Sequence, residues 1–240
     1  MNANLAVVTA AKLNSALADA DPSAIVTAAV RAIAPSRLAV ASSFGIESAT
    51  LLKIVADVDP SIPVLFLDTE WLFPETLSYR ETLVERLGLR DVRTIKPAAA
   101  AVAEKDPHRD LWSTDPDACC HLRKVEPLSG VLENFDGWIN GRKRYQGGER
   151  ASIPVVEAEG RRLKFNPLAR STPAEIAAMF RDWNLPLHPL AGKGFSSVGC
   201  IPCTRPSHSA EAVRAGRWAD SEKTECGIHN RMPLIDGAGI

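Results

Sequence analysis

The 240-residue sequence has no apolar run that approaches the roughly 18 to 20 residues of a membrane-spanning helix. Its first residues lack the charged region and apolar core of a secretion signal. It also lacks an excess of charge of either sign, because 28 Lys and Arg oppose 29 Asp and Glu. Without a chain-wide basic field, non-specific binding to nucleic acid is not expected. These absences predict a cytoplasmic protein that binds neither nucleic acid nor a membrane, and whose anionic ligands are small.

The sequence has no internal repeat, and its hydrophobic content of 45% is enough for a sizeable core. Short apolar runs predict buried strands at residues 37–41, 64–68, 92–96 and 138–141. Helical periodicity or capping residues predict helices within 4–34, with a break at Asp21-Pro22, and at 48–57, 74–87, 115–134 and 172–183. Residues 153–157 and 161–165 flank Gly160 and predict a hairpin. This alternation predicts an α/β fold with a mostly parallel sheet flanked by helices, and with ligands at the carboxyl ends of its strands.

Five cysteines are an odd number, and four of them form two close pairs. Cys119 and Cys120 are adjacent, whereas Cys200 and Cys203 form a Cys-x-x-Cys pair that we expect on an irregular loop. In a reducing compartment, this arrangement favours a metal or cluster site plus a separate thiol over a disulfide framework. Cys226 is that separate thiol.

Four thiolates suit either a tetrahedral zinc ion or an iron–sulfur cluster. The adjacent pair favours a [4Fe–4S] cluster, because neighbouring side chains on a helix diverge and a cubane offers them separate iron corners. From the residues alone, a structural zinc site stays open, as does the burial of one or two cysteines as small apolar side chains.

Cys226 lies in the motif Glu225-Cys226-Gly227-Ile228-His229. An inert thiol is the ordinary interpretation of a lone cysteine in such a segment. Two neighbours favour a functional thiol instead. His229 could stabilise a thiolate or an anionic substrate, and Gly227 gives the backbone freedom next to the sulfur.

Candidate anion contacts lie in the loop after the predicted strand at 37–41 and among basic residues near the cysteines. Residues 42–48 form a small polar loop before a helix, a layout that aims backbone N–H groups at an anion, but they lack the Gly-Lys-Ser/Thr ending of a P-loop. Lys124 follows the cysteine pair, and we expect Arg214 and Arg217 to share one face of a helix. These three cations could converge on one small polyanion.

Six motifs together resemble the assimilatory sulfonucleotide reductases, specifically the cluster-containing adenylyl-sulfate (APS) reductases. They are Ser-Ser-Phe-Gly-Ile-Glu-Ser at 42–48, Leu-Asp-Thr-Glu-Trp-Leu-Phe-Pro-Glu-Thr at 67–76, Cys-Cys-His-Leu-Arg-Lys-Val-Glu-Pro-Leu at 119–128, Gly-Arg-Lys-Arg-Tyr-Gln at 141–146, Gly-Cys-Ile-Pro-Cys-Thr at 199–204 and Glu-Cys-Gly-Ile-His at 225–229. They occur in the family's order and span most of the chain.

The resemblance implies a fold similar to the adenine nucleotide alpha hydrolases, with a nucleotide- and cluster-binding α/β domain at 1–204 and a mobile C-terminal segment at 205–240. It implies that the [4Fe–4S] cluster is held by Cys119, Cys120, Cys200 and Cys203. It implies Cys226, His229 and Lys124 as catalytic residues, with the phosphosulfate held by Lys124, Arg214, Arg217 and His229. It places around the nucleotide Ser42, Ser43, Glu47, Thr69, Gly141 and Arg150.

The resemblance further implies reduction of adenosine 5′-phosphosulfate to sulfite and AMP, in sulfate assimilation and cysteine biosynthesis. Cys226 would form an S-sulfonate that thioredoxin, or a glutaredoxin-like dithiol donor, resolves. Assembly into a homo-oligomer stays open. The chain departs from the family at Glu70, where Gly is usual, and in having fewer glycines in the 42–45 loop.

Three alternatives compete with this function. A 3′-phosphoadenylyl-sulfate (PAPS) reductase would use the same nucleophile, but its usual form lacks the cluster cysteines. An ATP-dependent thiolation or adenylating enzyme would carry a glycine-rich Ser-Gly-Gly-x-Asp-Ser loop, which this chain lacks. A non-enzymatic iron–sulfur sensor would leave the motif around Cys226 unexplained.

Overall fold

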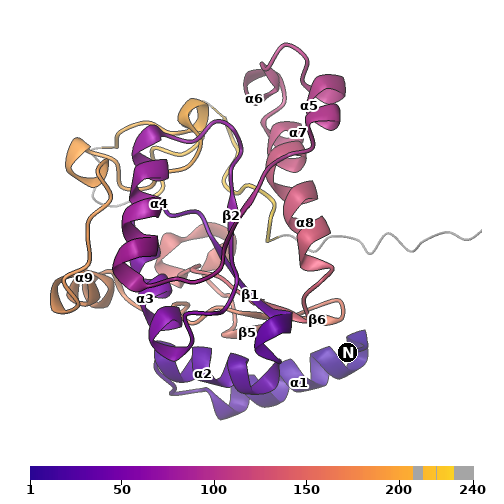
Figure 1. Cartoon of the computed structure of the whole chain (residues 1–240), viewed down its shortest axis with the longest axis vertical. Helices are drawn as coiled ribbons and strands as arrows, with labels where there is room; N and C mark the ends of the chain where they lie inside the picture. The colour runs from indigo at the N-terminus through magenta and orange to yellow at the C-terminus, as the bar shows by residue number, and fades with distance from the viewer. Residues whose placement is uncertain (208–212, 220, 230–240) are drawn as a thin grey trace, which may run out of the picture.

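A computed structural model describes residues 1–207, 213–219 and 221–229. Its centre is a six-stranded sheet in the order β3-β2-β1-β4-β6-β5 (Figure 1). Five strands are parallel: β1 (Leu38–Ser42), β2 (Val64–Leu67), β3 (Val92–Ile95), β4 (Gly137–Ile139) and β6 (Arg162–Phe165). The edge strand β5 (Val156–Glu159) is antiparallel to β6. The predicted α/β fold with a mostly parallel sheet is confirmed.

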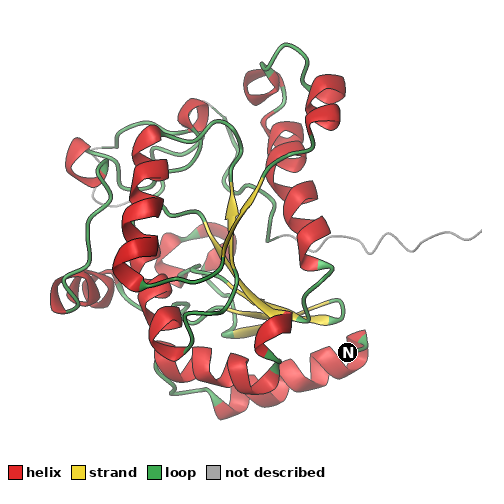
Figure 2. Cartoon of the chain, in the orientation of Figure 1, coloured by secondary structure: helices red, strands yellow, loops and turns green. Residues whose placement is uncertain are grey.

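Helices cover both faces of this sheet (Figure 2). One face carries α1 (Ala3–Ala16), α2 (Pro22–Ala32), α3 (Ser48–Val58), α4 (Pro74–Leu87) and α9 (Pro173–Asp182). The other carries α5 (Ala99–Lys105), α6 (Leu111–Thr114), α7 (Pro116–Cys120) and α8 (Glu126–Leu132). In the described residues, no helix combines the length and the apolarity that crossing a membrane requires.

Two hydrophobic cores lie on the two faces of the sheet. Val40 of β1 belongs to the larger core, under α2 and α3, whereas its neighbour Ala39 belongs to the smaller core. The smaller core also contains Trp138 of β4 and Leu128 of α8. Alternate residues of a strand point to opposite faces, so a strand buried on both faces is apolar throughout. This accounts for the continuous apolar runs in the sequence.

Capping residues fix several helix ends. The Asp21 side chain accepts from the Ala24 N–H at 2.8 Å and starts α2. Thr172 and Glu175 form the predicted capping box of α9, and the Glu175 carboxylate accepts from the Thr172 N–H at 2.7 Å. Gly88 ends α4 with a φ of 65°, in the left-handed region that glycine adopts without strain.

The single helix expected at 115–134 is wrong in one respect. Asp115 caps its start, but a π-helical turn at His121–Val125 separates α7 from α8. Pro127 has no N–H to donate to a helical hydrogen bond. In an α-helix its ring would also clash with the carbonyl of the residue four positions earlier. A wider turn before the proline avoids that clash. Such π turns are frequent at functional sites, and this one contains Lys124.

The helix expected to carry Arg214 and Arg217 is not present. Residues 213–216 form turns, and Arg217 makes an antiparallel bridge with Thr204. The Arg205 N–H bonds to the Gly216 carbonyl at 2.8 Å, next to that bridge. Pairing with the segment after the Cys-x-x-Cys motif therefore replaces helical hydrogen bonds, and it places both arginines beside the cysteines.

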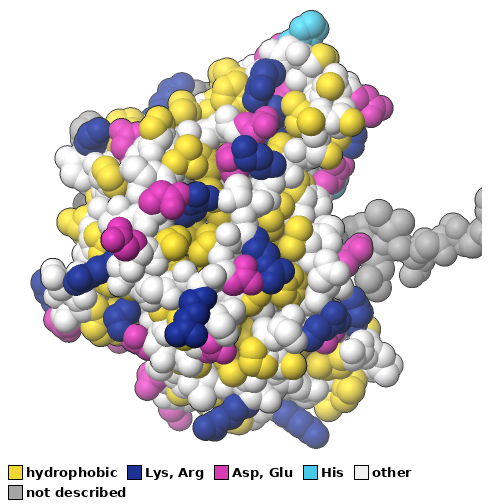
Figure 3. Space-filling model, in the orientation of Figure 1, with side chains coloured by type: hydrophobic (Ala, Val, Ile, Leu, Met, Phe, Trp, Pro, Cys, Tyr) yellow, Lys and Arg dark blue, Asp and Glu magenta, His cyan; other side chains and the backbone are white. Residues whose placement is uncertain are grey.

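The predicted hairpin is confirmed, with β5 and β6 joined at Gly160, whose φ is 58°. Residues 236–240, expected to be frayed, lie outside the described residues. The division at residue 204 stays a prediction. On the face shown in Figure 3, acidic and basic side chains are interspersed.

The sheet reverses its strand order between β1 and β4, because the chain leaves β1 toward β2 and later returns to the other side of β1. In open α/β sheets, ligands bind in the crevice outside the carboxyl ends of the strands at this kind of reversal. The segments that follow β1 and β4 therefore mark where to look for a site.

Candidate active site

A pocket lies at this reversal point, lined by segments that follow β1, β2 and β4 together with the 196–200 loop and parts of 213–229. It brings together all the residues expected to be catalytic or to bind substrate: Ser42, Ser43, Glu47, Thr69, Lys124, Gly141, Arg150, Arg214, Arg217, Cys226 and His229. Cys200 also lines it, whereas Cys119, Cys120 and Cys203 lie outside the lining. The roles of all these residues stay predictions. That the catalytic and substrate-binding candidates line one pocket is a feature of the fold.

The loop after β1 bends sharply before α3. The Ser42 side chain accepts from the Phe44 N–H at 3.2 Å, and Phe44 has a φ of 49°. Its ring is fully buried and packs edge-on against Phe66, which holds this strained residue in place. The bend leaves Ser42, Ser43 and the residues up to Ser48 at the rim of the pocket.

Glu47 ties that loop to the segment after β4. Its carboxylate is 3.0 Å from the Nζ of Lys143, accepts from Gln146 at 3.2 Å and also accepts from the hydroxyl of Tyr145. Lys143 is buried, and burial lowers its pKa. Glu47 therefore serves to position the 141–150 loop at the edge of the pocket.

Glu70, at the family's usual glycine position, does not line the pocket. Its φ is 63°, a conformation that a glycine adopts without strain. Its carboxylate pairs with Arg109 at 3.0 Å and with Arg123 at 3.3 Å, and Arg123 also pairs with the buried Asp106 at 2.8 Å. These ion pairs join the loop after β2 to the π-helical turn, and they account for a side chain at a strained position.

The four paired cysteines come from two segments that pack together. Cys119, Cys120 and Cys200 are buried and Cys203 is half-buried. Burial raises the pKa of Cys119 to about 12, and the neighbouring Cys120, Cys200 and Cys203 contribute to the increase. A buried group of this kind needs a cationic partner to hold thiolates, and metal coordination supplies one. The donor set therefore fits an iron–sulfur cluster.

The arrangement of the cysteine side chains does not by itself distinguish a single metal ion from a cluster. In residues 1–207, 213–219 and 221–229, no three His, Cys, Asp or Glu side chains form a group that could hold one metal ion. The Cys200 sulfur is held by Thr69 instead, whose hydroxyl lies 3.2 Å away. Although burial alone raises the pKa of Cys200, the charge of Lys124 and this hydrogen bond lower it overall.

Lys124 links the cysteines to the pocket. Its Nζ lies 3.8 Å from the sulfur of Cys120. Burial alone lowers the pKa of Lys124, but negative charge on Cys200, Cys120 and Cys226 raises it overall, so the lysine stays charged. One positive charge therefore interacts with the paired cysteines and with Cys226.

The sequence did not point to Trp218 as a site residue, although several cationic side chains of the pocket lie against its ring. Its indole is 6% exposed, lines the pocket and has an Nε1 atom without a hydrogen-bond partner. The cationic groups of Arg217, Arg214 and Lys124 lie 4.4, 5.5 and 5.9 Å from its ring centroid. The signal was its place directly after Arg217, but a single tryptophan there is equally typical of a core residue.

Gly199 leaves room for Arg217. A Cβ at this position would lie 2.3 Å from a terminal nitrogen of the Arg217 guanidinium, which is a clash. Arg217 also donates from Nε to the Cys203 carbonyl at 3.4 Å. The Cys-x-x-Cys loop therefore fixes the arginine by its backbone.

The segment 221–229 closes the pocket from the other side. Glu225 pairs with Arg150 at 2.5 Å and with Arg214 at 3.5 Å. Burial alone raises the pKa of Glu225, but these arginines hold it below the usual range. Gly227 has a φ of 84°, which confirms that the backbone next to Cys226 needs a glycine.

His229, expected to stabilise a thiolate or an anionic substrate, lines the pocket. Burial and the charges of Arg142 and Lys164 hold its pKa well below the usual value, so the imidazole is neutral. Its Nδ1 atom is buried without a hydrogen-bond partner. A neutral imidazole can offer a hydrogen bond to an anion, but it adds no charge.

Comparisons with known proteins show which family the chain resembles in sequence. Residues 37–206 match the model of the phosphoadenosine phosphosulfate reductase domain. Adenosine 5′-phosphosulfate reductase of Mesorhizobium japonicum is 44% identical over 92% of this chain and 87% of its own. The enzyme of the same name from Chelativorans sp. is 48% identical over 80% of this chain and 78% of its own.

Solved structures support the fold. Phosphoadenylyl-sulfate reductase from Candida auris, a phosphate complex, superposes with a TM-score of 0.69 at 22% identity, covering 82% of this chain and 96% of its own. FMN adenylyltransferase from Candida glabrata gives 0.56 at 14% identity, covering 87% and 74%. The matched domain and the identity to the two bacterial enzymes show that the chain belongs to the phosphoadenosine phosphosulfate reductase family.

Proposed function

We propose that this protein reduces adenosine 5′-phosphosulfate to sulfite and AMP in sulfate assimilation, with Cys226 as the nucleophile. One observation carries the proposal: Cys226 shares a pocket with Lys124, Arg214 and Arg217, and the Nζ of Lys124 also lies 3.8 Å from the sulfur of Cys120. The names of the two bacterial relatives support adenosine 5′-phosphosulfate as the substrate.

The nucleotide end of the pocket would hold adenosine monophosphate. Ser42, Ser43 and Gly141 offer backbone and hydroxyl groups at the carboxyl ends of β1 and β4. Parallel-sheet pockets with this layout bind nucleotides through such groups rather than through side-chain charges. Arg150 lies farther along the loop that follows β4, where it pairs with Glu225. It would contact the substrate once Glu225 moves away or once the substrate and Glu225 bind different nitrogens of its guanidinium.

In the first step, the Cys226 thiolate attacks the sulfur of the sulfate group. The bond between that sulfur and the bridging oxygen breaks, and AMP leaves with the oxygen. Charge spreads over the peripheral oxygens of the transferring group, as in phosphoryl transfer. Lys124, Arg214 and Arg217 would stabilise this charge, and each such contact is worth about 2–4 kcal/mol in comparable sites.

In the second step, a dithiol such as reduced thioredoxin resolves the adduct. Its thiolate attacks the Cys226 sulfur, and sulfite leaves with the electron pair of the broken sulfur–sulfur bond. The second thiol of the donor then displaces Cys226 and the donor becomes a disulfide. Two electrons pass from the dithiol to sulfate sulfur, and the protein ends reduced.

We further propose that Cys119, Cys120, Cys200 and Cys203 hold a [4Fe–4S] cluster. The buried thiols and the adjacent cation support this assignment. When bound, the cluster supplies electrostatic and structural stabilisation and no electrons for sulfite formation. Lys124 would then connect the charge of the thiolates to the charge of the substrate. The dithiol donor also supports a reducing cytoplasm as the site of action.

Sulfite release from APS and from PAPS, by anaerobically purified protein with reduced thioredoxin, tests the function. We expect a strong preference for APS, a sulfonate mass adduct on Cys226 without donor, and no sulfite from C226S. Preference for PAPS would keep the chemistry and overturn the substrate, an outcome consistent with the Gloeobacter violaceus relative, which is named a phosphoadenosine 5′-phosphosulfate reductase and is 38% identical. Sulfite from neither substrate, or full turnover by C226S, would refute the proposed function.

A further inference from the structure

Lys164 of β6 is a buried charge that the proposed reaction does not use. Only 1% of its surface is exposed, and it does not line the pocket. Its Nζ lies 3.7 Å from the carboxylates of both Glu157 and Glu159 on the neighbouring strand β5. Burying a lysine is costly even with such partners, and at these distances the ion pairs offset only part of the cost. Its presence therefore calls for a reason beyond the sheet.

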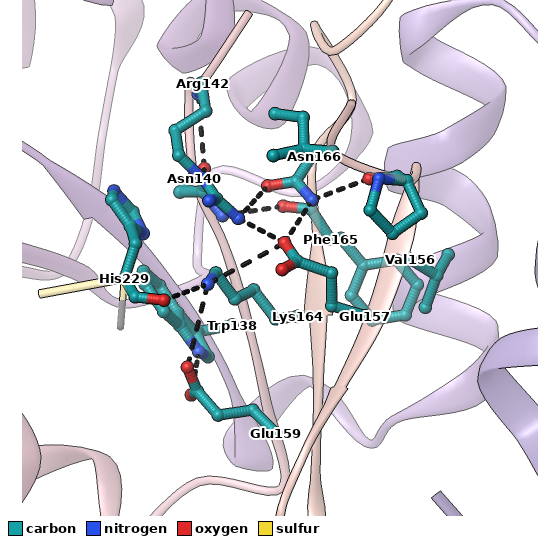
Figure 4. A network of polar contacts seen from close by, with 12 residues as sticks. Trp138, Asn140, Arg142, Val156, Glu157, Glu159, Lys164, Phe165, Asn166 and His229 are labelled. Carbon is teal, nitrogen blue, oxygen red and sulfur yellow. Dashed lines mark hydrogen bonds and ion pairs between the residues drawn. The ribbon is translucent and has the colours of Figure 1, made fainter. Parts of the chain in front are cut away.

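That reason lies in the C-terminal segment. Lys164 donates a hydrogen bond from Nζ to the backbone carbonyl of His229 at 3.3 Å (Figure 4). The imidazole of His229 stacks on the indole of Trp138, with ring centroids 5.4 Å apart and an interplanar angle of 1°. The Nζ of Lys164 also lies 5.2 Å from the centroid of the same indole. Backbone and side chain of His229 thus contact one lysine and one tryptophan.

The lysine and the tryptophan are themselves fixed by the sheet. Trp138 is fully buried in β4 and donates from Nε1 to Glu159 at 2.9 Å. Glu157 accepts from Asn166 at 2.7 Å and also accepts from Arg142. These contacts come from β4, β5 and the segments that follow β4 and β6 (Figure 4). His229 belongs to a segment more than 60 residues later in the chain. The contact surface for His229 is therefore a preformed part of the sheet.

We propose that Lys164 and Trp138 form a latch that docks His229 and thereby positions the neighbouring Cys226 at the pocket. The inference rests on the proposed function. Cys226 lies three residues before His229, so docking His229 confines the sulfur to within about 10 Å of the latch.

The latch consists of one hydrogen bond and one ring stack, and it acts together with the ion pairs that Glu225 makes with Arg150 and Arg214. Each of these contacts is individually weak enough to open, as delivery of a Cys226 adduct to a dithiol requires. Lys164 is a positioning residue that does not touch the substrate.

The test measures how often Cys226 is exposed. K164M keeps the apolar stem and removes the donor, so we expect iodoacetamide to alkylate Cys226 roughly three- to tenfold faster than in the wild type, as loss of one hydrogen bond implies. Mass spectrometry of the peptide that contains Cys226 reports this rate in the substrate-free holoprotein. The KM for APS should rise by a similar factor, while kcat stays within about twofold because bound substrate supplies its own contacts to the segment.

E159Q is the matched control. It removes one charge partner of Lys164 but leaves the contact with the His229 carbonyl and an oxygen for Trp138. We expect a lower midpoint of thermal unfolding and a nearly unchanged alkylation rate. An unchanged alkylation rate in K164M, or equal acceleration in both variants, would overturn the latch. If K164M does not fold, K164Q, with a shorter stem and a remaining donor, must show an intermediate acceleration.

Alkylation needs no substrate, so the latch and the proposed function fail separately. A wild-type protein that releases no sulfite from APS would refute the function alone. A wild-type protein that reduces APS, together with a K164M variant whose Cys226 is alkylated at the wild-type rate, would refute the latch alone.

Discussion

The two ends of the pocket treat their cations differently. At the nucleotide end, Arg142, Lys143 and Arg150 each pair with a carboxylate of Glu157, Glu47 or Glu225. At the sulfur end, which is the end next to Cys226, Arg214 pairs with Glu225 at 3.5 Å. Lys124 and Arg217, in contrast, have no ion pair with a carboxylate in the part of the chain that the structure describes. They lie instead against the ring of Trp218 and beside cysteine side chains or carbonyls.

This difference shows how one site can have ordered loops and still offer positive charge to an anionic ligand. Cations that already have a carboxylate position loops, since an added anion would have to displace that partner. Cations that are held by an aromatic face and by backbone carbonyls keep most of their charge for an anion that arrives. The sulfur end therefore has the positive charge that a transferring sulfate group needs, while the nucleotide end has shape and order.

The largest expected effect concerns two lysines that line the pocket, one at each end. K124M should lower kcat/KM for APS roughly 100- to 1,000-fold, because it removes a cation at the developing charge. K143M is the matched control, since Lys143 also lines the pocket but pairs with Glu47 at 3.0 Å. It should lower the midpoint of thermal unfolding and change kcat less than about tenfold. Equal losses of kcat/KM in the two variants, at equal iron content, would erase the distinction between the two ends.

Trp218 sharpens the comparison at the sulfur end. W218L keeps an apolar side chain without the negative aromatic face, so four cations lose a shared contact: Arg217, Arg214, Lys124 and Lys223. We expect kcat/KM for APS to fall roughly 10- to 50-fold, and W218F, which keeps a weaker aromatic face, to recover most of the loss. Steady-state kinetics with both variants check this. If W218F and W218L were equally impaired, shape rather than the aromatic face would be the cause.

Gly199 tests the placement of Arg217 alone. G199A adds a Cβ where the guanidinium lies, and the flexible end of Arg217 must move to make room. We expect the KM for APS to rise roughly fivefold with little change in stability, because no backbone clash is involved. G192A is the control, since a Cβ there meets nothing within 4 Å. A change in thermal stability of G199A without a change in KM would contradict the assignment.

His188 is a buried titratable residue that belongs to neither end of the pocket, and it allows a test of the pH dependence of stability. Its Nδ1 accepts from the Leu190 N–H at 3.1 Å and its Nε2 lies 3.1 Å from the Thr76 hydroxyl, so it is neutral, and burial lowers its pKa to about 4. The unfolded chain binds a proton near pH 6.5, whereas the folded one does not, so stability is present above pH 6.5 and falls as the pH approaches 4. The free energy of unfolding should drop by about 1 kcal/mol between pH 7.5 and 5.5.

Chemical denaturation across this pH range measures the drop. H188Q keeps polar contacts and cannot titrate, so its unfolding free energy should lose less between the same two pH values. An identical slope in H188Q would assign the pH dependence to other groups.

Local signals in the sequence were enough for most of the fold. Continuous apolar runs predicted the strands because parallel strands are buried on both faces, and the caps at Asp21 and Thr172 predicted helix starts because their side chains bond locally. The helix expected around Arg214 was wrong because pairing with Thr204, a long-range contact, overrode the local spacing. The π turn depends on Pro127 and on packing together, so helical periodicity could not show it.

The sequence by itself determined the chemistry that this protein can offer: four paired thiols, a lone thiol beside a glycine, and cations near each. Residue types and spacing suffice for that, because thiolate and cation chemistry belongs to the side chains. Only the tertiary structure decided which cations stay without carboxylates, that His229 is neutral, and that Trp218 and Lys164 matter. Charge pairing and burial depend on segments brought together across the sheet, and sequence spacing does not contain those distances.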